Sequence, residues 1–232
     1  RSNSEICPQM AATIPKFKSY CAHQKTFDID PGFMPLDGKW PSLIRYYRHT
    51  RGLSRENLAE QLDVGSLTIY RWENGLFQPN LSQQQTLRDM IFQPLETSSR
   101  YARIQRRVED SHTPMALLMG SLILSGSKPL KQLNQKHHHN IKVFSSIENI
   151  YDGRIETWME ARDRAGFFKG EVAQTFGRYR LADNDVRMIS TYPLPLENGS
   201  ILTITFHRPL DPDIQYPDEN QFTIVHNDEL VA

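Results

Sequence analysis

A short stretch at residues 66–74 carries polar side chains whose spacing suits contact with a partner. Gly75 ends the helix expected there, and Ile69 and Trp72, three positions apart, are expected to face inward. Helical geometry then places five side chains on the outer face: Ser66, Leu67, Thr68, Tyr70 and Arg71. Their hydroxyls and guanidinium give the helix a polar outer edge that can donate hydrogen bonds to a partner.

Two further helices must hold this one in place. Ser42 is expected to cap the first helix, which Gly52 ends, and Ser54 is expected to cap the second. The second helix buries one apolar stripe, formed by Leu58, Ala59 and Leu62. Two short helices joined by a tight turn at residues 64–65, the second with an apolar inner edge and a polar outer edge, have helix-turn-helix geometry.

These residues also carry a family resemblance. From residue 44 the chain follows the string IR-x-x-R-x-x-x-GLS-x-x-x-LA-x-x-L-x-V-x-x-x-TI-x-x-WENG. Over residues 44–91 it resembles the helix-turn-helix domain of the Cro/phage-repressor (XRE) class, with agreement at nearly every core position of that family's pattern. The resemblance implies a protein that binds double-stranded DNA.

The resemblance also implies a role for each matching position. The five outer residues of 66–74 would read base edges, with Arg71 as the best candidate for a bidentate contact to guanine and Leu67 or Thr68 packing on a thymine methyl. Arg48 and Glu73 match a buried pair that joins the first helix to the third. Three residues occupy positions that contact phosphates, namely Ser54, Arg55 and Asn74. Two alternatives stay open: Tyr70 could only cover the surface, and Arg55 could be an ordinary solvated charge.

The chain departs from the family pattern in two places. Gly65 stands where the family usually has Ser or Thr, which predicts a weaker helix cap. The loop after Gly75 reads LFQPN, whereas many relatives carry Lys or Arg there, so fewer phosphate contacts are expected. A nearby group of arginines could compensate as a phosphate-facing flank or could belong to a solvated linker: Arg100, Arg103, Arg106 and Arg107.

Beyond residue 113 the pattern changes from helices to strands. Runs at 115–120 and 121–126 predict a hairpin, and Asn198-Gly199 predicts a tight turn between the last two of three later strands, at 177–183, 186–195 and 200–209. A helix over 154–168 is expected to end near Gly166. Residues 106–208 resemble a PAS domain in this order of hairpin, short helices, lid helix and closing antiparallel sheet.

The PAS resemblance implies a domain for dimerisation and for sensing a small molecule. Such a half-open core can hold a ligand or only its own side chains, and both alternatives stay open. No cofactor follows with certainty. The photoactive flavin subclass is not expected because it needs a cysteine in this half of the chain, and the chain's two cysteines are Cys7 and Cys21.

These segments predict an α+β protein with an all-α helix-turn-helix domain followed by a PAS-like antiparallel-sheet domain. The expected organisation is an N-terminal arm at 1–40, a helix-turn-helix domain at 41–93, a connecting helix at 94–111, a PAS-like domain at 112–208 and an acidic tail at 209–232.

The composition of the 232 residues excludes several classes. The 27 Lys and Arg balance the 27 Asp and Glu, so any attraction to nucleic acid must come from local segregation of charge. No apolar run reaches membrane-spanning length and no leader is visible, so we expect a cytoplasmic, nucleoid-associated bacterial protein. Catalytic motifs are absent, and the His137-His138-His139 run is expected to be a solvated loop rather than a metal site, so no enzyme is predicted.

The sequence therefore predicts a sequence-specific, dimeric transcriptional regulator that binds a palindromic operator. Two alternatives remain, a ligand-independent repressor of a mobile element and a protein-interaction adaptor with a degenerate helix-turn-helix. The sequence predicts neither the operator nor whether the protein activates or represses.

Overall fold

The computed structural model describes residues 36, 38–137, 147, 154–182, 185–211 and 222–230. The chain divides into two units, Arg1–Met34 and Pro35–Ala232, and the described residues belong to the second. The predicted arm, both cysteines and two of the three adjacent histidines lie outside the described residues.

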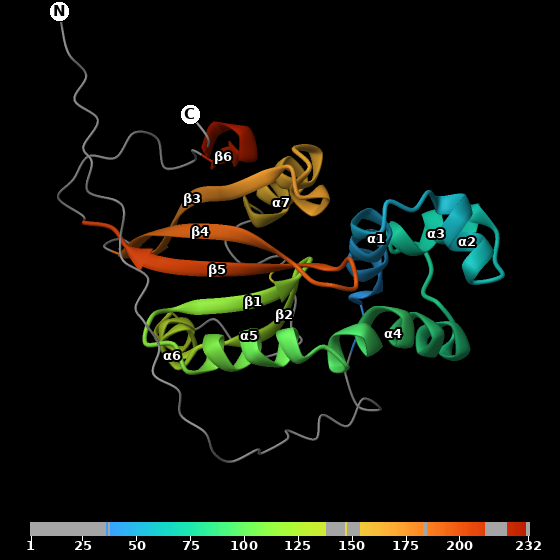
Figure 1. Ribbon diagram of the computed structural model, residues 1–232, viewed down its shortest axis with the longest axis horizontal. Coiled ribbons are helices and arrows are strands. Elements are labelled where there is room, and N and C mark those ends of the chain that lie inside the picture. The colour runs from blue at the N-terminus through green and yellow to red at the C-terminus, as the bar shows by residue number, and fades with distance from the viewer. Residues whose placement is uncertain are drawn as a thin grey trace, which may run out of the picture. The chain divides into compact units, whose positions relative to one another are not determined.

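Four helices form the first half of this unit, which we call the helical part (Figure 1). They are α1 (Trp40–Thr50), α2 (Arg55–Gln61), α3 (Ser66–Glu73) and α4 (Leu81–Glu96). The three helices expected before residue 75 are confirmed, and the positive φ angles of Gly52 and Gly75 occur where those residues end α1 and α3. Each of these helices buries apolar side chains almost completely, among them Trp40, Leu43, Ile44, Leu58, Ile69 and Leu87.

The start of α1 differs from the prediction. The helix begins at Trp40, and the Ser42 hydroxyl donates to the Lys39 carbonyl oxygen from within the first turn rather than capping the helix. Pro41 lies in this first turn, where a missing N–H group breaks no helical hydrogen bond. The proline therefore marks the start of the helix better than the serine does.

The segment expected to connect the two halves is part of the folded body. α4 continues through Pro94 to Glu96, and α5 (Ser99–Glu109) follows after the Ser98 cap. The buried Val108 and a 2.9 Å hydrogen bond from the Ser125 hydroxyl to the Glu109 carboxylate hold α5 against the sheet. Because it is packed in this way, α5 is not a free linker.

The second half of the unit, which we call the sheet half, is built on an antiparallel sheet with the strand order β2-β1-β5-β4-β3-β6. The strands are β1 (Met115–Met119), β2 (Leu122–Gly126), β3 (Val172–Ala182), β4 (Asp185–Pro195), β5 (Ile201–Pro209) and β6 (Phe222–His226). Between β2 and β3 lie α6 (Lys128–Lys136), α7 (Arg154–Arg164) and the short 3₁₀ helix η2 (Phe167–Lys169). The opening hairpin joins the closing strands through the β1–β5 pair, which matches a PAS-like fold.

Helices α6 and α7 cover one face of this sheet. Leu130 and Leu133 of α6 pack on Ala116 and Leu118 of β1. Trp158 of α7 packs with Tyr179 and Ile189, and its ring stacks on Phe222 of β6. This face therefore forms an apolar core under α6 and α7, and α7 covers it as expected for the lid helix.

The prediction that residues 209–232 form an acidic tail is wrong for residues 222–230. β6 pairs with β3 and a second 3₁₀ helix, η3 (Asn227–Leu230), follows it, so residues 222–230 belong to the fold rather than to a solvated terminus. The acidic side chains that dominate the composition of 209–232 flank the apolar and β-branched run 222–225. This run pairs with β3 through backbone hydrogen bonds, which do not depend on the charge of the neighbouring side chains.

Candidate nucleic-acid interface

The outer face of α3 is open to solvent. Leu67 is 57% exposed and Tyr70 45% exposed, and Ser66 and Arg71 are exposed as well, while Thr68 is half-buried. On the opposite side of the helix, Ile69 and Trp72 are buried in the core. The predicted orientation of α3 is confirmed, and the five side chains stand together on one accessible surface.

A single buried carboxylate holds α3 against the two helices before it. Glu73 is 1% exposed, and its two oxygens accept hydrogen bonds from Arg48 Nε at 2.6 Å and from Arg55 Nε at 2.7 Å. Arg48 also donates to the Leu53 carbonyl oxygen in the turn between α1 and α2. Since hydrogen bonds to an ionised group are stronger than neutral ones, this cluster fixes α3 relative to α1 and α2.

Arg55 is therefore more than the solvated charge or phosphate contact that its position suggests. The sequence pattern pairs Glu73 with Arg48 alone, yet the structure gives that carboxylate a second guanidinium. Arg55 also lies over the Tyr70 ring, with its Cζ 5.5 Å from the ring centroid. Its side chain remains 42% exposed, so it still presents positive charge beside α3.

The other two predicted phosphate-contacting residues are helix caps. The Ser54 hydroxyl accepts from the Asn57 N–H at 3.1 Å and so caps α2, as expected. Asn74, at the end of α3, donates from its side-chain amide to the Tyr70 carbonyl oxygen at 2.7 Å. Gly65 precedes α3 without a side-chain cap, which confirms the weaker start predicted for that helix.

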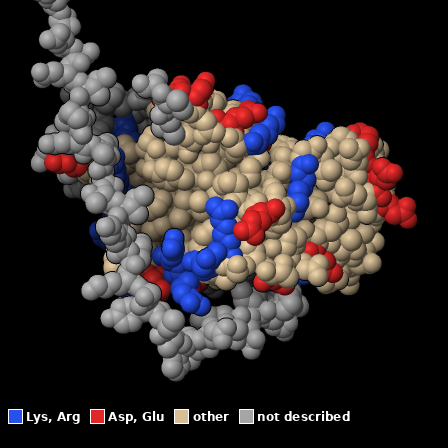
Figure 2. Space-filling view, in the orientation of Figure 1, with Lys and Arg blue, Asp and Glu red and all other residues tan. Residues whose placement is uncertain are grey.

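The loop after α3 presents apolar side chains where many XRE-class proteins carry cations. Leu76 and Phe77 of the loop and Leu81, the first residue of α4, are all largely exposed. The Arg71 guanidinium lies 5.6 Å from the centroid of the Phe77 ring. Figure 2 shows few charged side chains over the part of this region that faces the viewer. The sequence pattern indicates that cations are missing here, but it does not indicate that the apolar side chains in their place are exposed.

Positive charge gathers instead over α5, as Figure 2 shows. Arg103, Arg106 and Arg107 are exposed on this helix, and Arg100 at its start is half-buried. Since α5 packs on the sheet, these arginines belong to a fixed surface. Of the two alternatives for these arginines, a flank that faces DNA phosphates requires such a fixed surface, whereas a solvated linker does not.

The covered face of the sheet contains an unusually polar interior. Tyr179 and His207 share a 2.6 Å hydrogen bond, and Thr205 lies 3.2 Å from the second ring nitrogen of His207. Burial, aided by the charge of Arg187, lowers the pKa of His207 to about 3, so its ring is neutral near pH 7. His207 is thus a buried, neutral member of a hydrogen-bonded group in the interior of the sheet.

Other buried polar atoms of the sheet half have no hydrogen-bond partner among the described residues. They are Asn134 Oδ1, Thr175 Oγ1, Thr203 Oγ1, and Nε and Nη2 of Arg162 on α7. Native proteins rarely leave such atoms unpaired, and the usual partner is a water or a ligand. The interior of the sheet half therefore has unused hydrogen-bonding capacity.

His137 does not lie in a solvated loop. It ends α6, and its Nε2 lies 2.8 Å from Asp185 Oδ2. Although burial raises the pKa of Asp185, hydrogen bonds from Arg187 and His137 outweigh it and hold that pKa below its usual value. Within the described ranges no group of His, Cys, Asp or Glu is arranged to hold a metal ion.

Helix α1 connects the helical part to one end of the sheet. The Tyr46 hydroxyl donates to the Ile201 carbonyl oxygen at 3.0 Å, and the Tyr46 ring meets Phe168 edge-on at 5.6 Å. Burial raises the pKa of the Tyr46 hydroxyl above its ordinary value, so it stays a neutral donor. A side chain on Gly120, in the β1–β2 turn, would approach Tyr46 to 3.1 Å. The two halves thus meet without space for a larger turn residue.

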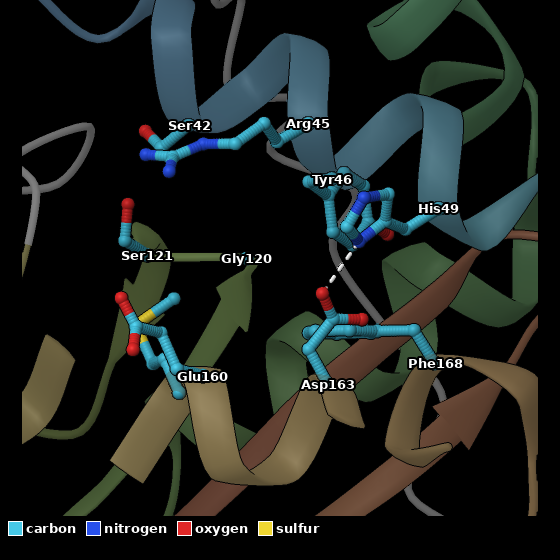
Figure 3. Close-up of a pocket in the computed structure, with 10 residues that line it drawn as sticks. Ser42, Arg45, Tyr46, His49, Gly120, Ser121, Glu160, Asp163 and Phe168 are labelled. Atoms are coloured by element: carbon cyan, nitrogen blue, oxygen red, sulfur yellow. Dashed lines mark ion pairs between the residues drawn. The ribbon is translucent and has the colours of Figure 1, made fainter. Parts of the chain in front are cut away.

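A cavity of about 390 Å³ opens beside this contact (Figure 3). The first helix contributes Ser42, Arg45, Tyr46 and His49 to its lining, and the sheet half contributes Gly120, Ser121, Met159, Glu160, Asp163 and Phe168. At one end, His49 Nδ1 lies 2.6 Å from Asp163 Oδ2. The sequence offered no signal for this cavity because its two walls are distant along the chain.

Comparisons with known proteins give only distant likenesses. No family profile and no curated protein matches the chain. Among solved structures, the phage VqmA–DPO complex aligns at 16% identity with a TM-score of 0.38, over 49% of this chain and 55% of that one. The PAS domain of an HTR-like protein from Haloarcula marismortui aligns at 16% identity and 0.32, over 51% and 96%. A Rhodobacter sphaeroides LOV protein aligns at 13% and 0.35, over 48% and 66%.

This chain thus spans little more than half of the VqmA chain that it matches. The PAS-like interpretation rests on the strand order of this sheet and on the helices that cover it. Among the described residues, no helix combines the length and apolar character needed to cross a membrane.

Proposed function

We propose that this protein is a sequence-specific DNA-binding transcriptional regulator of the bacterial nucleoid, without enzymatic activity. The observation that carries the proposal is the exposed outer face of α3, which the Glu73 cluster and the buried Ile69 and Trp72 hold in one orientation. An α-helix that presents polar side chains in a fixed orientation fits the width of the DNA major groove. In this proposal α2 and α3 form the helix-turn-helix of an XRE-class domain.

The sheet half supplies dimerisation and sensing in this proposal. Its PAS-like strand order supports a role in small-molecule binding, and so do the interior hydroxyls of Thr175 and Thr203, which have no hydrogen-bond partner among the residues that the structure describes. Helix-turn-helix dimers place two recognition helices about one turn of DNA apart. The expected target is therefore a palindromic operator bound by a homodimer. Analytical ultracentrifugation of the purified protein measures the mass and so tests for the dimer.

The direct test selects binding sites from random double-stranded DNA with the full-length protein. The enriched sequence is then bound to the Arg71→Ala variant, in which one proposed guanine contact is lost. We expect a loss of about 1–3 kcal/mol at the cognate site and a relaxed preference at one base pair. Lys131→Ala on α6 is the matched control, because it removes one exposed positive charge far from α3 along the chain.

The result separates base recognition from general attraction. If Arg71→Ala loses the same affinity on cognate and random DNA, Arg71 contacts phosphate and its assignment as a base-contacting residue is wrong. If the selection enriches no sequence at all, the DNA-binding proposal itself fails.

A protein-interaction adaptor is the second candidate function. The specific observation that favours it is the exposed apolar group Leu76, Phe77 and Leu81 in and after the loop that follows α3. Residues 41–93 hold six arginines against five acidic residues, which is a weak positive excess for a DNA-binding domain. Failure of the DNA selection together with self-association that Phe77→Ser abolishes would favour this candidate.

A further inference from the structure

The cavity between α1 and the sheet half has charge of opposite sign on its two walls. Arg45 extends from α1 along the upper wall in Figure 3, and the Glu160 carboxylate of α7 lies on the lower wall. Among the described residues neither side chain has an ion-pair partner, whereas His49 and Asp163 pair with each other at the far end. As far as the described residues go, the cavity therefore presents one cation and one anion without ion-pair partners to whatever enters it.

The remaining lining is suited to a small molecule with an apolar part. Ser42 and Ser121 place hydroxyl groups beside Arg45 and Glu160 in Figure 3. Met159 and Phe168 add apolar surface. A volume of about 390 Å³ lies within the range of small-ligand sites, which combine apolar walls with a few polar groups that fix orientation.

We propose that this cavity binds a small zwitterion, a free α-amino acid with an apolar side chain. Its carboxylate pairs with Arg45, its ammonium group pairs with Glu160, and its side chain packs on Met159 and Phe168. A purely anionic or purely cationic molecule would leave one of the two wall charges without a partner. A zwitterion satisfies both, because its two charges are carried by neighbouring atoms of one small framework.

Such a ligand would join the two halves of the molecule. Arg45 belongs to the helix that meets α3 through the Arg48–Glu73 contact, and Glu160 belongs to the helix that covers the sheet. Occupancy would therefore stabilise one arrangement of α1 relative to α7, by differential affinity for that arrangement. Binding itself is independent of the proposed function, and only an effect on DNA affinity rests on it.

The test measures binding to the full-length protein without DNA. The twenty proteinogenic amino acids are screened singly by thermal denaturation, and the strongest is titrated by calorimetry alongside its N-acetyl and its carboxamide derivatives. We expect an apolar amino acid to bind, and each derivative, which keeps only one charge, to bind at least tenfold more weakly. Arg45→Gln and Glu160→Gln should each weaken the parent amino acid at least tenfold.

Matched controls keep the test specific. Arg103→Gln on α5 and Glu60→Gln on α2 remove equivalent exposed charges and should leave the affinity unchanged. Arg45 and Glu160 are themselves exposed, so their variants are expected to fold, which circular dichroism checks. Stabilisation by no amino acid, equal binding of either derivative, or unchanged affinity in both wall variants would each overturn the proposal. Because no DNA is present, these outcomes are independent of the DNA-selection result.

Discussion

The carboxylate of Glu73 holds three helices together because both of its oxygens are used. Arg48 from α1 and Arg55 from α2 each donate through Nε, and α3 carries the carboxylate itself. Glu73 is buried, so removing its charge would leave two guanidinium groups without the partner that compensates their partial loss of water. This buried residue therefore fixes the orientation of α3 relative to α1 and α2.

Glu73→Gln should therefore lower the free energy of unfolding by about 2–4 kcal/mol, somewhat less than a fully buried pair because Arg55 is partly exposed. Urea denaturation followed by circular dichroism measures this loss. Glu60→Gln, an exposed residue of α2, is the control and should change the stability little. Equal stability of the two variants would show that the cluster is not a structural contact.

His207 makes the stability of the sheet half depend on pH. Burial lowers its pKa to about 3, whereas an unfolded histidine has a pKa of about 6.5. Between these values the unfolded chain binds a proton that the folded protein does not, so stability rises with pH across this window. The contribution is complete above the unfolded pKa and is lost as the pH falls toward 3.

Lowering the pH from 7 to 5 should remove about 2 kcal/mol of stability through His207 alone. The measurement is urea denaturation of the native protein and of His207→Gln at both pH values. The glutamine variant is expected to be less stable at pH 7 because the Tyr179 contact changes, but to lose less on acidification. An unchanged pH dependence in the variant would assign the acid sensitivity to other groups.

At the scale of elements, the approach of α7 to β3 depends on a residue without a side chain. A Cβ at Gly177 would lie 2.8 Å from two atoms of the Trp158 ring, which also stacks on Phe222. The indole ring is rigid and the stack limits its retreat, so the added methyl group cannot be accommodated by rotation alone. Gly177 therefore sets the distance between the lid helix and the sheet.

Gly177→Ala should destabilise the protein by about 1–3 kcal/mol, the usual range for inserting a group into a packed core. Gly126→Ala is the matched control, because a Cβ there would meet only ordinary contacts at 3.6 Å or more. Thermal denaturation compares the two variants. A stability loss as large in Gly126→Ala would mean that strand geometry rather than the Trp158 contact is responsible.

Elements with local signals were predictable from the sequence. The β1–β2 hairpin and the turn at Gly199 are specified by residues next to one another, and both are present, with positive φ at Gly120 and Gly199. The buried partners of α3, Ile69 and Trp72, followed from helical spacing in the same way. The edge strand β6 could not be predicted in this way, because it is stabilised by pairing with β3, which lies more than forty residues earlier in the sequence.

The candidate site was likewise predictable only where its signals are local in the sequence. The outward residues of α3 and the Arg48–Glu73 pair were predictable from spacing and family pattern, and the structure places them as expected. The second arginine on Glu73 and the cavity beside Tyr46 were not, because each depends on which helices meet in space. No periodicity within one element carries that information.

Across the whole described unit, α1 and α4 make the contacts through which the helical part meets the sheet half. Its Tyr46 contacts the end of β5, the β1–β2 turn and η2, while Asn198 in the β4–β5 turn donates to the Pro94 carbonyl oxygen of α4. Contacts of this number and burial predict that the helical part and the sheet half open together rather than independently. That cooperativity is what a ligand signal would need to reach α3.

Hydrogen exchange tests this coupling through one hydroxyl group. In the native protein, amides of α1 and β5 should share the same free energy of opening. Tyr46→Phe removes the hydrogen bond to Ile201 but keeps the ring, so it should cost about 1 kcal/mol and let α1 exchange before β5 does. Tyr47→Phe on the same helix is the control, since none of the described residues bonds to that hydroxyl. If α1 and β5 already exchange at different free energies in the native protein, the halves are not coupled through α1, and a ligand in the sheet half has no route to α3 along this helix.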